Sequence, residues 1–255
     1  MAGSEPVVKA AGCALVSGGS GGLGGEICRA LSGLGYAVVV GYRGNVDKAS
    51  ALVAELEAAG GLAMAKQIDV TAGEALVESF RAVREVFGPI AAVVSAAGPS
   101  GRFDFISRAP LDEWRRLFET DVLGCIALAR AAIPHLRESR GSFTALATYQ
   151  ARKLEVRGSF SSVPKAAVER LVQALAKEEG RYGVRANAVR AGWIDAGGGA
   201  RMTQDPAFLA RKLTEIPLGR LGLGQELAEA VAFLASPRAS FITGAVLTVD
   251  GGESL

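Results

Sequence analysis

Residue types that build many common active sites are scarce in this chain. A single histidine, His135, excludes sites that need two or three imidazoles, such as HExxH zinc centres. Three scattered cysteines, Cys13, Cys28 and Cys125, are too few for a disulfide framework or a cysteine zinc site. The 28 basic and 26 acidic residues nearly cancel, and no dense basic block is present, so we expect no nucleic-acid partner.

Long apolar runs are missing as well. No uninterrupted apolar stretch approaches the roughly 18 residues that a membrane-spanning helix needs, and the amino end lacks the basic segment and cleavage site of a signal peptide. We therefore expect a chain that neither crosses a membrane nor is secreted. The low cysteine content fits a reducing cytoplasm, which is the expected location.

The 255 residues are 49% hydrophobic and include 33 glycines, which favours a globular chain with many tight turns. Short apolar runs alternate with segments of helical period, as in βαβ units. We predict an α/β fold, a Rossmann-type doubly wound parallel sheet of about seven strands, in one domain over residues 1–255. Strands are expected at 13–17, 37–41, 62–68, 90–95, 142–148, 185–189 and 246–248, and helices at 22–34, 47–59, 73–87, 111–136, 162–182 and 225–235.

One long connection interrupts this alternation. The segment Arg190–Gly224 contains no expected strand and carries the sequence AGGGARMTQDP. We predict a mobile loop with short helices above the carboxyl edge of the sheet, where such loops often cover a substrate.

A glycine-rich turn follows the first expected strand. Gly18, Gly22 and Gly24 stand between that strand and a helix, with Ser20 inside the turn. Glycines allow the backbone to approach a pyrophosphate, whose charge the helix N-terminus then binds. The stretch also satisfies the G-x-S-x-G pattern of hydrolases, with Ser20 as nucleophile, but His135 is poorly placed to act as the base. Dinucleotide binding is the favoured interpretation.

The second strand indicates which dinucleotide is bound. An NAD-specific site would carry an acidic residue at its end to bind the ribose 2′-hydroxyl, but Gly41 and Tyr42 stand there and Arg43 follows. A guanidinium suits a 2′-phosphate, so NADP(H) is the predicted cofactor; a solvated turn arginine is the alternative. Asp69, after the third strand, is either an adenine contact or a helix cap.

The motifs together resemble the short-chain dehydrogenase/reductase family, in the style of 3-oxoacyl-carrier-protein reductases. The resemblance rests on the glycine loop, Asp69-Val70, the turn Ser95-Ala96-Ala97-Gly98, the stretch Asn187–Gly192, Ile216–Arg220 and Thr243–Gly252. It implies cofactor contacts from Leu23, Val70, Ala96, Gly98, Gly192 and Ile194, in addition to the residues above. It also implies a homodimer or homotetramer and a small-molecule or acyl-thioester substrate.

The catalytic positions depart from the pattern of this family. Lys165 matches the lysine of the family's YxxxK motif, but Ser161 stands where the tyrosine is usual. Thr148 replaces the usual serine and Asp121 the usual asparagine. In the family the phenol protonates the carbonyl oxygen and the lysine binds the ribose. A serine hydroxyl is far less acidic than a phenol, so ordinary ketone reduction is in doubt.

A tyrosine at another position could replace the missing acid. Tyr149 follows Thr148 at the expected carboxyl end of a strand, where it would face the cleft and serve as the acid. Serine four residues before the lysine, with tyrosine at the strand end, is similar to the 2,4-dienoyl-CoA reductase branch of the family. In that branch hydroxyls bind the thioester oxygen while hydride enters a remote carbon. Each of Ser161, Thr148 and Tyr149 also has a purely structural interpretation.

Three functions follow from these residues. The first is an NADPH-dependent reductase of a conjugated enoyl or keto group with an altered set of acids. The second is a non-redox cyclase, dehydratase or lyase, in which Asp121 or Tyr149 does acid–base work. The third is a catalytically silent nucleotide-binding subunit. Asp121 is either a buried acid with raised pKa or an ion-pair partner of Lys165.

Overall fold

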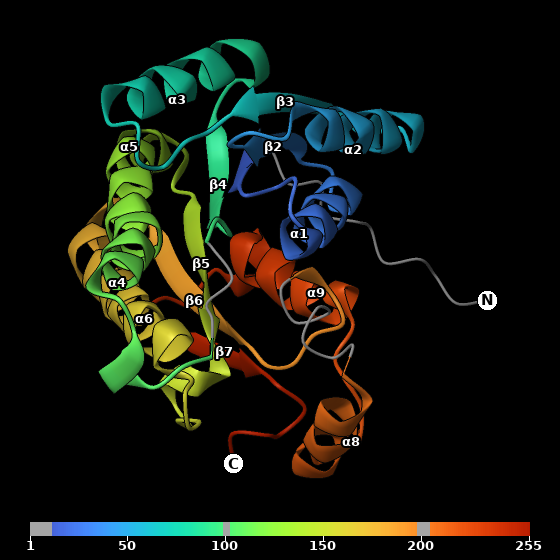
Figure 1. Ribbon diagram of the computed structural model, residues 1–255. Coiled ribbons are helices and arrows are strands. Elements are labelled where there is room, and N and C mark those ends of the chain that lie inside the picture. Colours follow the sequence, from blue (N-terminus) through green and yellow to red (C-terminus); the bar gives the residue numbers. More distant parts are fainter. Residues whose placement is uncertain (1–11, 99–102, 198–204) are drawn as a thin grey trace.

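The computed structural model describes residues 12–98, 103–197 and 205–255, and its elements alternate as the sequence predicts (Figure 1). The strands are β1 Cys13–Ser17, β2 Ala37–Tyr42, β3 Ala63–Gln67, β4 Ile90–Ser95, β5 Ser142–Thr148, β6 Arg185–Ala191 and β7 Val246–Val249. The helices are α1 Gly22–Gly33, α2 Val46–Ala58, α3 Glu74–Phe87, α4 Leu111–Leu117, α5 Gly124–Ser139, α6 Ser159–Glu179, α8 Pro206–Glu215 and α9 Gly224–Ala235.

The seven strands form one parallel sheet in the order β3-β2-β1-β4-β5-β6-β7. The order reverses direction between β1 and β4, so the connections that leave these two strands diverge to opposite sides. In doubly wound folds this is the place where ligands bind, at the carboxyl ends of the strands. The predicted single-domain Rossmann-type fold is thereby confirmed.

Helices cover both faces of the sheet (Figure 1). Alternate residues of β1 divide between two cores: Val16 packs with Ile27 and Val231 of α1 and α9, whereas Leu15 packs with Phe80 and Leu128 of α3 and α5. Because successive side chains of a strand point to opposite faces, a strand covered on both sides must be apolar throughout. This explains the unbroken apolar runs in the sequence.

Two predicted boundaries were wrong in an informative way. The helix expected over 111–136 is divided into α4 and α5 by a π-helical turn, Phe118–Leu123, which no periodicity signals. In the connection expected to lack strands, β6 extends to Ala191 and a bridge joins Ile194 to Gly222, whereas α8 is one of the short helices expected there. Residues 198–204 of this connection lie outside the described residues. No helix within the described ranges is long and apolar enough to span a membrane.

Candidate active site

A cleft of about 440 Å³ opens at the point where the strand order reverses. It is lined from four strand ends: by the turn after β1, the turn after β2, the residues after β3 and the turn after β4. Seven residues that the sequence predicted to bind a cofactor line this one cleft: Gly18, Ser20, Arg43, Asp69, Val70, Ala96 and Gly98. The fold therefore gathers residues that are up to 80 positions apart in the sequence.

Close backbone packing shapes the glycine turn. Gly18 has φ +73°, and a Cβ there would lie 2.8 Å from the backbone of Ala97. A Cβ on Gly24 would overlap the carbonyl oxygen of Gly18, and one on Gly22 would lie 2.5 Å from the amide nitrogen of Gly197. Only glycine fits these positions. Gly22, Leu23 and Gly24 begin α1, where backbone N–H groups lack helical acceptors and can bind a pyrophosphate.

Arg43 stands at the rim of the cleft and is exposed. Its carbonyl accepts a hydrogen bond of 2.9 Å from Gln67, and its guanidinium forms no ion pair with any residue that the structure describes. Asp69 accepts from both the backbone and the hydroxyl of Thr71, which lowers the pKa of its carboxyl. Asp69 thus closes a local turn with Thr71, and the helix-cap interpretation was wrong because the N-cap of α3 is Gly73. Its position on the cleft wall allows an adenine contact.

Asp121 and Lys165 form a buried ion pair beside this cleft. Lys165 Nζ lies 3.2 Å from Asp121 Oδ1, and the carboxylate side chain is only 3% exposed. Asp121 is the buried residue of the π-helical turn, and such turns are frequent at functional sites. Burial raises the pKa of the Asp121 carboxyl, and the Lys165 ammonium offsets only part of that rise. Both sequence interpretations of Asp121 thus apply together.

Gly98 connects the ion pair to the cleft. A Cβ on Gly98 would overlap Asp121 Oδ1 and lie 3.3 Å from Lys165 Nζ, while Gly98 itself lines the cleft together with Thr120. The absence of a side chain at Gly98 leaves the pair next to the space where a cofactor would lie. Nicotinamide-nucleotide binding therefore fits the residues present.

The two hydroxyls predicted to be catalytic lie on elements that pack together. Thr148 ends β5, and its Oγ1 accepts a long hydrogen bond of 3.4 Å from the amide of Gln150. Ser161 lies in the first turn of α6, and its amide donates to the carbonyl of Gly158. Both side chains are partly exposed. Thr148 thus has the weaker structural role of a cap, with its hydroxyl still at the carboxyl edge of the sheet.

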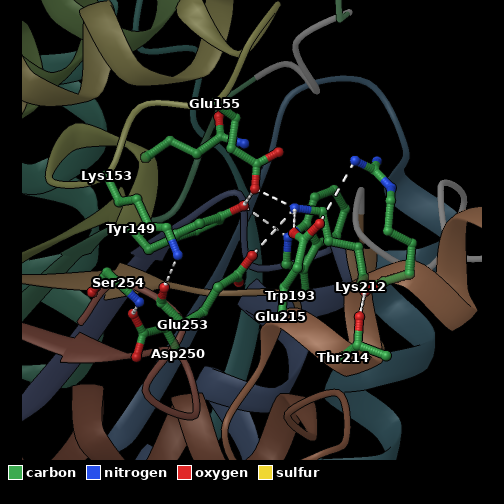
Figure 2. A network of polar contacts seen from close by, with 12 residues as sticks. Tyr149, Lys153, Glu155, Trp193, Lys212, Thr214, Glu215, Asp250, Glu253 and Ser254 are labelled. Atoms are coloured by element: carbon green, nitrogen blue, oxygen red, sulfur yellow. Dashed lines mark hydrogen bonds and ion pairs between the residues drawn. The ribbon is translucent and has the colours of Figure 1, made fainter.

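Tyr149 does not face the cleft, contrary to the prediction. Its side chain is 2% exposed and packs with Trp193 and Ile216 (Figure 2). Its hydroxyl donates to Glu155 and accepts a hydrogen bond of 2.8 Å from Trp193 Nε1. Burial and the adjacent carboxylate raise the pKa of Tyr149. β5 is followed at once by a short 3-10 helix, Tyr149–Ala151, whose first residue thus lies in the aromatic cluster and not in the cleft.

Lys212 of α8 lies at the centre of the same network (Figure 2). Its ammonium is bonded to Glu155 and lies 2.7 Å from Glu215 Oε2 and 3.3 Å from Glu253 Oε1. Burial disfavours the charge, but the hydrogen bonds and charges of these carboxylates hold the pKa of Lys212 above its usual range. The three carboxylates alone would be a plausible metal site. Lys212 already supplies the cation there.

Six predicted cofactor contacts do not line the cleft: Gly22, Leu23, Gly24, Lys165, Gly192 and Ile194. Gly192 is packed against Asp250, where a Cβ would lie 2.5 Å from the backbone, and Ile194 is buried in the core with α1 and α9. Sequence reasoning missed the network of Lys212, Glu155 and Glu253. No local pattern marks Lys212, because Glu155 and Glu253 are 57 and 41 residues away from it in the sequence.

Comparison with known proteins decides the family. The model of a family described as enoyl-(acyl carrier protein) reductase matches residues 18–254. The acetoacetyl-CoA reductase of Shinella zoogloeoides is 34% identical over an alignment of 244 residues that covers 94% of this chain and 97% of the relative. A short-chain type dehydrogenase/reductase from Mycobacterium ulcerans has a TM-score of 0.90 at 31% identity, covering 95% of this chain and 89% of that one.

The chain belongs to the short-chain dehydrogenase/reductase family. It is an oxidoreductase similar to acetoacetyl-CoA reductases, in a family that binds NAD(P). A gluconate 5-dehydrogenase from Burkholderia cenocepacia, solved in complex with NADP and tartrate, has a TM-score of 0.91 at 26% identity and covers 98% of this chain and 99% of that one. The family resemblance stated from the motifs is therefore confirmed.

Proposed function

We propose that the protein is an NADPH-dependent reductase of a keto or conjugated enoyl group on a small hydrophobic or thioester-bound substrate. The observation that carries the proposal is the cleft at the strand reversal, with the Asp121–Lys165 pair beside it. The guanidinium of Arg43, which forms no ion pair with the described part of the chain, lies at its rim. Similarity to an acetoacetyl-CoA reductase supports the substrate class. The family resemblance adds a homodimer or homotetramer.

The phosphate end of the cleft would bind the cofactor. Gly18 and Ser20, together with the N-terminus of α1, would hold the pyrophosphate, and Arg43 would bind the 2′-phosphate. Lys165 would bind the ribose of the nicotinamide half. Bound NADPH supplies the hydride. The structural neighbour solved with NADP supports this cofactor.

The proton-transfer set is unusual because Ser161 stands where the family carries tyrosine. We assign the binding of the substrate oxygen to the Thr148 and Ser161 hydroxyls, which can donate hydrogen bonds to a developing oxyanion. We assign the donation of the proton that the substrate takes up to the Asp121–Lys165 pair. The raised pKa of Asp121 allows its carboxyl to retain a proton at higher pH than usual. Tyr149 is assigned a structural role, since its hydroxyl is buried and doubly hydrogen-bonded.

The test is substrate-dependent oxidation of NADPH, followed by absorbance, with acetoacetyl-CoA as keto substrate and crotonyl-CoA as enoyl substrate. Asp121→Ala should lower kcat about 10²–10⁴-fold, as for a lost general acid. Tyr149→Phe should leave kcat within about tenfold once its fold is verified by circular dichroism. A large loss of kcat in a folded Tyr149→Phe protein would return the proton to the phenol.

A silent nucleotide-binding subunit is the second candidate, favoured by the serine at position 161. It would bind NADPH with normal affinity and oxidise none of it with either substrate. Product formed without net nicotinamide turnover would instead identify a non-redox enzyme on this fold.

A further inference from the structure

A second cavity of about 580 Å³ lies at the carboxyl edge of the sheet, beyond the end of β5. Its walls come from three connections: Phe103 follows β4, Lys153–Arg157 follow β5, and Phe208–Glu215 belong to α8. The first two of these connections also carry Gly98 and Thr148. The cavity is therefore lined by the same strand-end connections that carry the proposed active site.

Two cations of this cavity have no acidic partner among the described residues. Arg157 donates from Nη2 to the carbonyl of Phe103 at 2.9 Å, and Lys153 Nζ donates to the backbone carbonyl of Glu253. Both acidic side chains of the wall, Glu155 and Glu215, are instead bonded to Lys212, and Glu215 also lies 3.7 Å from Arg211 (the Lys212 contacts are drawn in Figure 2). The acidic side chains of the wall are thus paired with Lys212 and Arg211 rather than with Lys153 or Arg157.

Arg157 is also held in an unusual backbone conformation. Its φ of +69° is in the left-handed region, which costs a non-glycine residue about 1 kcal/mol or more. Its carbonyl accepts from the amide of Asp104, so that two hydrogen bonds join Arg157 to the Phe103–Asp104 segment. This pairing fixes the guanidinium at the wall of the cavity before any ligand arrives.

Apolar surface lies next to these cations. The rings of Phe103 and Phe208 both contact Trp193, at centroid distances of 6.2 and 5.1 Å, and Val156 is 78% exposed. A ligand in this cavity would therefore meet aromatic and aliphatic walls on one side and two cations on another. This combination suits a molecule with an apolar body and one anionic group.

We propose that this cavity binds the anionic part of the substrate, through Lys153 and Arg157. The proposal rests on the proposed reductase function and specifies its substrate as an anionic carbonyl compound. The anion is either a carboxylate on the substrate or a phosphate of a thioester carrier. Because neither Lys153 nor Arg157 belongs to the proposed proton-transfer set, we expect them to act on binding rather than on the chemical step.

The test compares three substrates of the same keto group: acetoacetyl-CoA, free acetoacetate and the uncharged ethyl acetoacetate. The uncharged ester should have a KM about 10- to 100-fold higher than the preferred anionic substrate, the value of one or two charge-assisted contacts. A lower KM for acetoacetate than for acetoacetyl-CoA would show that the cavity binds a carboxylate. A lower KM for acetoacetyl-CoA would show that it binds a phosphate of the carrier. Equal KM values for ester and both anions would overturn the proposal.

Variants test whether Lys153 and Arg157 act specifically on the binding of the anion. Arg157→Gln and Lys153→Gln should each raise KM for the anionic substrate about tenfold or more, with kcat within about twofold and no change for the ester. Matched controls are Arg238→Gln and Lys177→Gln, exposed cations outside this cavity, which should leave KM unchanged. Arg157→Lys should recover part of the loss. A Gln variant that raises KM equally for the ester would contradict the proposal.

A measurement without turnover keeps this proposal separate from the reductase assignment. Saturation-transfer NMR with acetoacetate and with coenzyme A, in the presence of NADP⁺, detects binding even if no NADPH is oxidised. Signal in the wild type that disappears in Arg157→Gln and persists in Arg238→Gln supports the anion site. The same signal in both variants would reject it.

Discussion

Replacing Lys212 by methionine tests the buried network most directly. Both Lys212 and Glu253 have side chains only 1% exposed, and the ammonium is the cation nearest to three carboxylates. Methionine keeps most of the volume and removes the charge. Breaking a buried ion pair by removing one partner costs about 3–5 kcal/mol, because a charge is left buried without compensation. We expect a loss of this size in the free energy of unfolding.

The assay is urea unfolding at pH 7, followed by tryptophan fluorescence. Trp193 is a suitable reporter because its indole lies 5.3 Å from Lys212 Nζ and donates to Tyr149. Lys177→Met, at an exposed position of α6, is the matched control and should change stability by less than about 0.5 kcal/mol. Lys212→Met/Glu253→Gln should recover about 1–2 kcal/mol by removing one orphaned charge.

The pH dependence of the stability loss in Lys212→Met gives an independent check, because its direction is fixed by the pKa of Glu253. Burial already raises the pKa of Glu253, and loss of the ammonium, which lowers it, must raise it further. A carboxyl whose folded-state pKa exceeds its unfolded value contributes stability at low pH and loses it as pH rises through the folded pKa. The deficit of Lys212→Met against wild type should therefore shrink from pH 7 to pH 5. A deficit under about 1 kcal/mol at pH 7, or one that grows on acidification, would refute this reasoning.

Four further changes test the site. Arg43→Ala should weaken NADPH binding by about 1.5–3 kcal/mol and leave NADH nearly unchanged in fluorescence titrations; equal losses would argue against a 2′-phosphate contact. Asp121→Asn should become more stable relative to wild type as pH rises, because the raised pKa of Asp121 makes its buried carboxylate destabilising above that pKa. Thermal denaturation at intervals of about one pH unit, from about pH 4 to about pH 8, measures this difference. Gly24→Ala should abolish binding of both nucleotides in the same titrations, because its Cβ would overlap the Gly18 carbonyl; normal affinity would mean that the turn can relax. Tyr149→Phe should cost about 1–3 kcal/mol in urea unfolding, because Trp193 Nε1 loses its acceptor, and an unchanged midpoint would show that this bond is dispensable.

Features that depend on the local sequence pattern were predicted correctly. The predictions failed for side chains whose position depends on residues far away in the sequence. The parallel, doubly wound sheet was predicted from the alternation of strands and helices, and Gly18, Ser20 and Arg43 were found because a turn after a strand lies at the edge of the sheet. Tyr149 was misplaced because β5 gives way to a 3-10 turn at this residue, and the sequence pattern did not indicate that turn. Lys212 was missed since its partners, Glu155 and Glu253, lie 57 and 41 residues away.

The same separations carry a consequence for the folding kinetics. The Lys212 network closes loops of 41 and 57 residues, and the bond from Lys153 to Glu253 closes one of 100. Loop closure over such lengths must be completed before these contacts stabilise anything, so we place them late on the folding pathway. Contacts absent from the transition state slow unfolding without accelerating folding. The buried Lys212 of α8 therefore slows the unfolding of this part of the enzyme and does not accelerate its folding.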